Sequence, residues 1–193
     1  HPDPVKLPGN NISDLAIFGD TRMTIERTWL DIVDSADKHN EPEKFTALIG
    51  WEWSSVPMGV NLHRVVVSPH GGDIAKSYLP FGSDQSQYPQ DLWEWLEDTR
   101  NKTGAEFLAI PHNSNISKGY MFDRTTHEGD QITASYAETR LAWEPIVEVT
   151  QIKGDSETHS KLSPNDDFAD FENYEYYIQV GKTEFMPLSL IHI

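Results

Sequence analysis

The feature that most constrains the fold is an alternation of short apolar runs with amphipathic segments of helical period. Four runs have the length and composition of buried strands: 45–53, 62–67, 107–110 and 146–152. Three other segments are expected to be helices: one from Thr24 that ends at Glu41-Pro42, one from Pro89 to Gly104, and one from Thr133 to Trp143. Strands alternating with helices are typical of α/β proteins with a largely parallel sheet, and we expect that fold class here.

Local signals support the helix boundaries. Apolar residues of the first segment recur with helical spacing on one stripe, at Ile25, Trp29, Ile32, Val33 and Ala36. Pro89 stands at the first-turn position that proline favours, and Gly104 is a typical helix terminator. The segments 1–20, 68–90 and 114–130 are rich in turn-forming or polar residues and are expected to be loops.

Composition excludes several classes of function. The chain has 15 Lys and Arg against 31 Asp and Glu, a formal net charge of -16. Such a field repels phosphate backbones, so bulk nucleic acid is not an expected partner, whereas divalent cations are. No apolar run approaches the roughly 18 residues of a membrane span. The absence of cysteine excludes disulfides, thiolate catalysis and zinc-thiolate sites, but it identifies no compartment.

We expect one domain over residues 1–185. The chain begins at His1 without a methionine, and residues 186–193 form an abrupt apolar tail, which is either a short strand or not native to the protein. Both ends suggest a piece of a longer chain. Neither the oligomeric state nor the compartment can be derived from these residues, although export is compatible with them.

Ionisable residues stand repeatedly at the ends of the expected strands, where α/β proteins build their sites. The candidates are Glu52, His63, His112, Glu148 and His159. A carboxylate in an apolar strand needs a cation or hydrogen bonds. Carboxylate and imidazole together form a ligand set for Zn, Mn or Fe. We therefore predict a metal site made of these residues.

Each candidate also has a plainer interpretation. Glu52 could be a buried carboxylate paired with Arg64, and Glu148 could pair with Lys153 or Arg140. His63 could be an exposed edge residue, and His112 could be a core histidine bonded to the backbone. His159, in a polar loop, could be a surface residue. The evidence for a metal site is that the candidates share a position at strand ends, and no single residue is sufficient evidence.

Other chemistries have little support in the sequence. It has no Gly-x-Gly-x-x-Gly or P-loop pattern, no Gly-x-Ser-x-Gly elbow and no His-Glu-x-x-His pattern. The tryptophan pairs 51/53 and 93/95 could stack on sugars. Trp93 and Trp95 cannot share one helix face, however, and core packing is the expected role for most of these rings.

Several strings resemble the bacterial domain-of-unknown-function family 3604, from about residue 24 to 172. They are Phe45-Thr-Ala-Leu-Ile-Gly-Trp-Glu-Trp53, Asn61-Leu-His-Arg64, Asp91-Leu-Trp-Glu-Trp95, Ala109-Ile-Pro-His-Asn113, the stretch from Val147 to His159, Ser163-Pro-Asn-Asp166 and Phe168-Ala-Asp-Phe171. That family looks related to the polymerase and histidinol phosphatase (PHP) superfamily. The resemblance implies a distorted (β/α)7 barrel, partial in this chain because its N-terminal and C-terminal strands are missing.

The resemblance also implies two or three metal ions and hydrolysis, most often of phosphoesters, by a metal-bound hydroxide. Glu52 resembles the carboxylate that bridges the metals, and His63 and His112 resemble metal histidines; Glu52 and His112 are the expected catalytic residues. The superfamily's Asp-Leu-His-x-His-Thr, Thr-Asp-His and Gly-x-Asp-x-His strings are absent. Further ligands are therefore expected outside this chain, which we expect to be inactive alone.

The leading hypothesis is thus a fragment of a metal-dependent hydrolase that uses metal-activated water on a small anionic substrate. Arg64 or Lys153 would bind an anionic oxygen of that substrate. Two alternatives stay open. The aromatic and acidic residues could form a carbohydrate-active or carbohydrate-binding module, or the barrel could be a non-catalytic scaffold.

Overall fold

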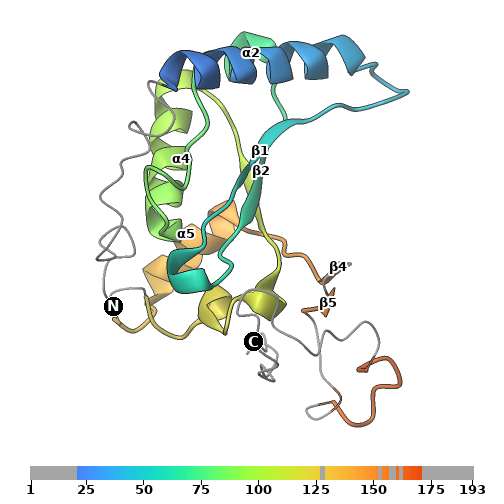
Figure 1. Ribbon diagram of the computed structural model, residues 1–193, viewed down its shortest axis with the longest axis vertical. Coiled ribbons are helices and arrows are strands. Elements are labelled where there is room, and N and C mark those ends of the chain that lie inside the picture. The colour runs from blue at the N-terminus through green and yellow to red at the C-terminus, as the bar shows by residue number, and fades with distance from the viewer. Residues whose placement is uncertain (1–20, 127–128, 152–153, 157–159, 161–162, 171–193) are drawn as a thin grey trace.

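A computed structural model describes residues 21–126, 129–151, 154–156, 160 and 163–170 (Figure 1). The helices are α2 (Arg22–His39), α3 (Gly72–Ala75), α4 (Pro89–Thr103) and α5 (Ala134–Trp143), and the short 3-10 helices are η2 (Pro57–Gly59), η3 (Ser114–Ile116) and η4 (Tyr120–Phe122). The strands are β1 (Ile49–Trp53), β2 (Arg64–Ser68), β3 (Leu108–Pro111), β4 (Thr150–Gln151) and β5 (Gly154–Asp155). The expectations for residues 1–20 and 186–193 lie outside the described residues.

The main sheet has three antiparallel strands in the order β1-β2-β3. Trp53 pairs with Arg64, and Arg64 pairs in turn with Pro111. A two-stranded antiparallel ribbon, β4-β5, lies apart from this sheet. The expectation of a partial, mostly parallel (β/α)7 barrel is therefore wrong for the described part of the chain. The same holds for the barrel that the scaffold alternative assumed, whereas its non-catalytic role stays a hypothesis.

The connection between the first two strands explains this topology. A parallel pair needs a crossover of a dozen or more residues, usually a helix. Between β1 and β2 the chain has only residues 54–63, which contain the single-turn η2. This connection returns the chain beside β1 in the opposite direction. The long α3–α4 segment then brings β3 to the free side of β2, again antiparallel.

The three predicted helices are confirmed. α4 begins at Pro89 and ends at Thr103; the following Gly104 caps it, with a left-handed φ of 78° and its N–H donated to the Arg100 carbonyl. Thr133 caps α5 by accepting the Tyr136 N–H on its side chain. In α2 only part of the predicted stripe is buried. Trp29 and Val33 are buried, whereas the other apolar positions are more exposed.

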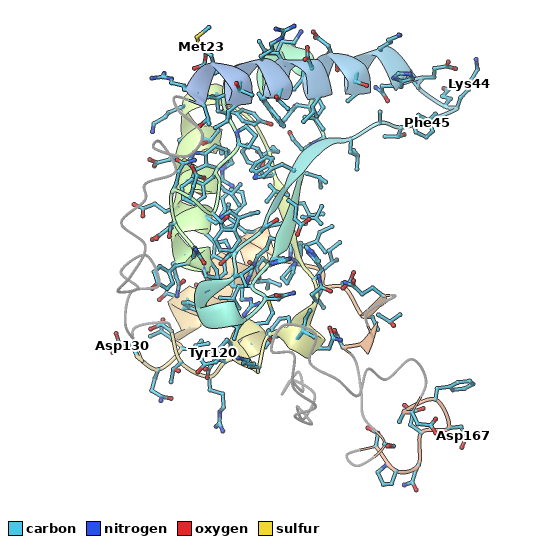
Figure 2. The ribbon with its side chains drawn as sticks, viewed as in Figure 1. Met23, Lys44, Phe45, Tyr120, Asp130 and Asp167 are labelled. Atoms are coloured by element: carbon cyan, nitrogen blue, oxygen red, sulfur yellow. The ribbon has the colours of Figure 1, made fainter. Side chains whose placement is uncertain are left out.

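The core lies between the sheet, α2 and α4, where side chains fill the space (Figure 2). Aromatic rings dominate it. Trp51 packs edge-on against Trp29, Trp95 and Phe107, with ring centroids 5.7–6.1 Å apart. Indole N–H groups of β1 also fix the 81–86 segment, because Trp51 donates to the Phe81 carbonyl and Trp53 to that of Ser86. Phe45, by contrast, projects from the surface.

Two local expectations need correction. The run 146–152 was predicted as one strand, but its described part contributes only Thr150–Gln151 to β4. Residues 146–149, which precede β4, run irregularly beside β3, where the Glu148 N–H donates to the Pro111 carbonyl. The expected loops 68–90 and 114–130 contain the short helices α3, η3 and η4. Among the described helices, none combines the length and apolar character needed to cross a bilayer.

Candidate metal centre

Three of the predicted site residues meet at one end of the main sheet. Glu52 lies near the end of β1, His63 directly precedes β2, and His112 directly follows β3. In an antiparallel sheet the end of one strand lies beside the start of its neighbour, so these positions coincide. The His112 N–H donates to the His63 carbonyl at 3.3 Å, extending the β2-β3 ladder by one step.

The side chains converge on one carboxylate oxygen. His63 Nδ1 lies 3.0 Å and His112 Nε2 3.4 Å from Glu52 Oε1. The two imidazole rings are 5.5 Å apart between centroids. The histidine side chains are 14% and 12% exposed, whereas that of Glu52 is 47% exposed. The group is thus open to solvent on the side of Glu52 and enclosed on the side of the rings.

The geometry fits a metal ion. One ligand atom from each residue lies within 4.8 Å of the other two, and no other such group of three occurs among the described residues. Metal bonds of about 2.0–2.2 Å place neighbouring ligand atoms roughly 3.0–3.5 Å apart. The two contacts to Glu52 Oε1 fall in this range. A carboxylate with two imidazoles is also the protein ligand set of many catalytic zinc sites, and it suits Mn and Fe.

Glu148, a fourth predicted ligand, does not join this group. Its Oε2 accepts the Asn113 backbone N–H at 3.0 Å and the Gln151 side-chain amide. It therefore lies against the turn that follows His112. Neither of the alternative ion pairs can be assigned to it, since Arg140 pairs with Glu144 and Lys153 lies outside the described residues.

His159, the fifth predicted ligand, also lies outside the described residues, as does the predicted substrate contact of Lys153. Both stay predictions. Ser156, the last described residue before His159, is buried, and its hydroxyl accepts the Asn115 N–H at 3.1 Å. The ribbon that precedes His159 is thus attached to the loop that follows His112.

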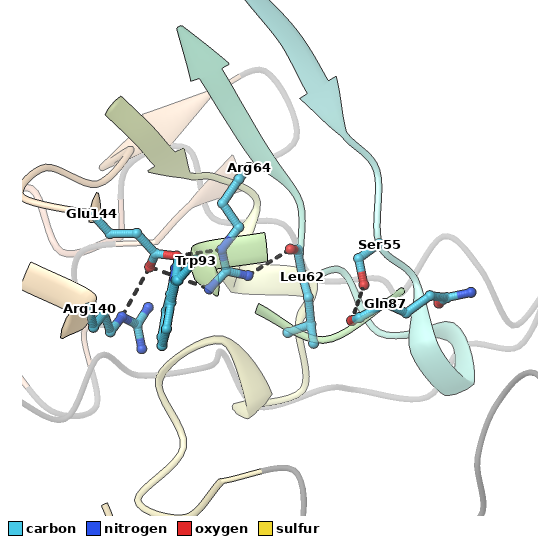
Figure 3. A network of polar contacts seen from close by, with 7 residues as sticks. All are labelled: Ser55, Leu62, Arg64, Gln87, Trp93, Arg140 and Glu144. Carbon is cyan, nitrogen blue, oxygen red and sulfur yellow. Dashed lines mark hydrogen bonds and ion pairs between the residues drawn. The ribbon is translucent and has the colours of Figure 1, made fainter. Parts of the chain in front are cut away.

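Arg64, the other predicted substrate contact, lies in the core (Figure 3). Its side chain is 1% exposed, and Nε donates to Glu144 Oε1 at 2.9 Å. Its Nη1 donates to the Leu62 carbonyl at 2.6 Å. The Arg64–Glu52 pair considered from the sequence is therefore replaced by an Arg64–Glu144 pair. This arrangement favours a structural role for Arg64 over contact with a substrate.

Glu144 is the centre of a buried network that the sequence reasoning missed. Its carboxylate also accepts the Trp93 indole N–H at 2.8 Å and pairs with Arg140 at 3.0 Å. The available signal was the i,i+4 spacing of Arg140 and Glu144 at the end of a predicted helix. The network ties α4, α5 and β2 together next to His63.

The charge state of Glu144 makes stability depend on pH. Burial raises the pKa of Glu144, but the opposite charges of Arg64 and Arg140 and the hydrogen bonds from Arg64 and Trp93 outweigh it, so the pKa is lowered overall. A lowered folded-state pKa stabilises the fold fully above the unfolded-state pKa, and this stabilisation is lost as pH falls through the folded-state pKa.

We expect Glu144→Gln to be less stable than the wild type at pH 7 and the difference to shrink below about pH 4, where the free carboxyl group protonates. Urea unfolding of both proteins between pH 7 and 3 measures this. A difference that stays constant over that range would contradict the ionised state of Glu144.

The aromatic residues considered for sugar stacking pack in the interior. Trp53, Trp93 and Trp143 are almost fully buried, and Trp51 and Trp95 pack against each other and the core. Trp93 and Trp95 do point to different neighbours: Trp93 contacts Tyr136, and Trp95 stacks on Phe81. These rings form no exposed platform of the kind that sugar stacking requires.

The described chain is thus a protein of helices around a small antiparallel sheet, with a candidate Glu–His–His metal centre at one end of that sheet. Residues 9–190 match the model of the family described as "Protein of unknown function (DUF3604)". The chain belongs to this family, as its sequence strings indicated. No match was found among curated proteins or among solved structures.

Proposed function

We propose that this chain is part of a metal-dependent hydrolase that acts on phosphoester-type bonds of a small anionic substrate. The observation that carries the proposal is the convergence of Glu52, His63 and His112 from three separate segments. A divalent Zn, Mn or Fe ion held there would supply a Lewis acid and a bound water of lowered pKa.

The residues of the chain have distinct tasks in this proposal. His63 and His112 are ligands held by the ladder between their backbones. Glu52 is the third ligand of the metal, because its Oε1 is the atom that both histidines contact. Its partial exposure supports access of a substrate to the site. The net charge of -16 disfavours polyanionic substrates and thus favours small ones.

The relation to the PHP superfamily, with its two or three metal ions, belongs to the same proposal. It is supported by the Gly-Trp-Glu-Trp53 and Ile-Pro-His-Asn113 strings, which contain Glu52 and His112. The barrel is not part of it. Arg64 is not part of it either, because its guanidinium is buried with Glu144.

The test uses the protein encoded by the complete gene, treated with a chelator and then supplied separately with Mn, Zn or Fe. We expect hydrolysis of a small phosphomonoester or phosphodiester to disappear on chelation and to return with one of the metals. His112→Gln should abolish the recovered activity. His39→Gln, which changes a histidine at the end of α2, should retain it. Hydrolysis that survives chelation, or no hydrolysis with any metal, would contradict the proposal.

A further inference from the structure

A single residue, Glu148, holds the main chain on both sides of His112. Its N–H donates to the Pro111 carbonyl at 3.0 Å, and its Oε2 accepts the Asn113 N–H at 3.0 Å. That carbonyl and that N–H belong to the two peptide units that flank the His112 Cα. Because each peptide unit is planar, fixing both units fixes the backbone torsions of His112.

This contact supports a tight turn. Asn113 adopts a left-handed φ of 59°, a conformation that is uncommon for residues with a side chain and that asparagine adopts more often than most. Its N–H meets a carboxylate, which makes the hydrogen bond stronger than one between neutral groups. The Gln151 amide donates to the same oxygen and so orients the carboxylate. The carboxylate thus fixes the direction in which the chain leaves His112.

The His112 ring depends on this backbone for its position. The His112 N–H is bound to the His63 carbonyl on one side, so β2 and Glu148 hold the residue from two directions. Within the described residues, the ring Nδ1 is buried without a hydrogen-bond partner. The ring is therefore placed by its backbone and by the contact of Nε2 with Glu52.

We infer that Glu148 is a positioning residue of the metal centre, which acts on the metal through His112 and not as a ligand. This inference rests on the proposed function, since it presupposes that His112 binds a metal. Residues that orient a metal ligand typically change metal affinity 10–100-fold when they are replaced.

Two replacements of Glu148 separate orientation from charge. Glu148→Ala removes the acceptor of the Asn113 N–H, and we expect Zn²⁺ affinity to fall about 10–100-fold. Glu148→Gln keeps a carbonyl oxygen for that N–H but loses the negative charge, and we expect a loss below about 10-fold. Zinc affinity is measured by competition with a chelator on folded protein, and hydrogen exchange of the Asn113 amide is measured by NMR.

The matched control is Asp37→Ala. The Asp37 carboxylate also accepts a backbone N–H, that of Gly72, with both oxygens at 3.0 Å. It lies on α2 beside α3, on elements that contribute nothing to the metal centre. We expect this variant to lose stability but to keep zinc affinity. Compared with the wild type, the Asn113 amide should exchange its hydrogen faster in Glu148→Ala and at the same rate in Asp37→Ala.

Each remaining outcome is decisive. A folded Glu148→Ala protein that binds zinc as tightly as the wild type overturns the inference and leaves the proposed function standing. Equal losses in Glu148→Gln and Glu148→Ala show that the carboxylate acts by charge or as a ligand, which also overturns it. A wild type that binds no zinc, manganese or iron overturns the proposed function, and the inference with it.

Discussion

Replacement of Glu144 by alanine is expected to lower the free energy of unfolding by about 3–5 kcal/mol, the cost typical of breaking a buried ion pair from one side. The carboxylate is 1% exposed and is shared by two guanidinium groups and an indole. Its removal leaves the Arg64 charge buried without its partner. Chemical denaturation at pH 7 measures the change.

Glu26→Ala is the matched control for this prediction. Glu26 also pairs with an arginine, Arg22, at 3.0 Å, but both side chains are exposed. Surface pairs of this kind contribute about 0–1 kcal/mol. A loss of less than about 1 kcal/mol in Glu144→Ala, equal to that of the control, would show that the network of Figure 3 contributes little to the fold.

Replacement of Glu52 by alanine is expected to reduce affinity for the bound divalent metal more than 100-fold. This exceeds the 10–100-fold effects of residues that only orient ligands, because Glu52 supplies the oxygen that faces both imidazoles. The fold should be nearly unchanged, since the side chain is about half exposed. Calorimetric titration with Zn²⁺ or Mn²⁺, with thermal unfolding in parallel, measures both effects.

Glu94→Ala controls for the general loss of negative charge. Glu94 is an exposed acid on α4 outside the metal centre. If both variants lose metal affinity equally, the acidic surface as a whole attracts the cation, and Glu52 is not a specific ligand.

Sequence periodicity was sufficient for the helices because their signals are local. Pro89 and Gly104 act on neighbouring backbone groups, and the structure uses both as expected. Thr133, where the third helix was expected to begin, is its N-cap. Strand pairing is not local. Two consecutive strands with no long helix between them indicate an antiparallel pair. The short connection 54–63 therefore predicts the antiparallel pairing of β1 with β2, whereas the later helices misleadingly indicate a parallel sheet.

The antiparallel topology also explains why Glu52, His63 and His112 lie together, which the expected parallel sheet does not. In a parallel sheet, His63, at the start of β2, would lie at one edge of the sheet, and the ends of the other strands, with Glu52 and His112, would lie at the other edge. The antiparallel order brings the start of β2 beside Glu52 and His112. The contacts of Glu148 with Asn113 and of Glu144 with Arg64 could not be predicted, because these partners are distant in sequence. Only the i,i+4 pair of Glu144 with Arg140 left a local signal.

The most direct test of the metal centre is NMR of protein labelled with ¹⁵N in its histidine rings, followed during addition of Zn²⁺. We expect the ring nitrogens of His63 and His112 to shift together at one equivalent of metal, while those of His39 and His70 stay unchanged. Shifts at His39 or His70 alone, or no shift at His63 and His112 at saturating zinc, would contradict metal binding at this end of the sheet.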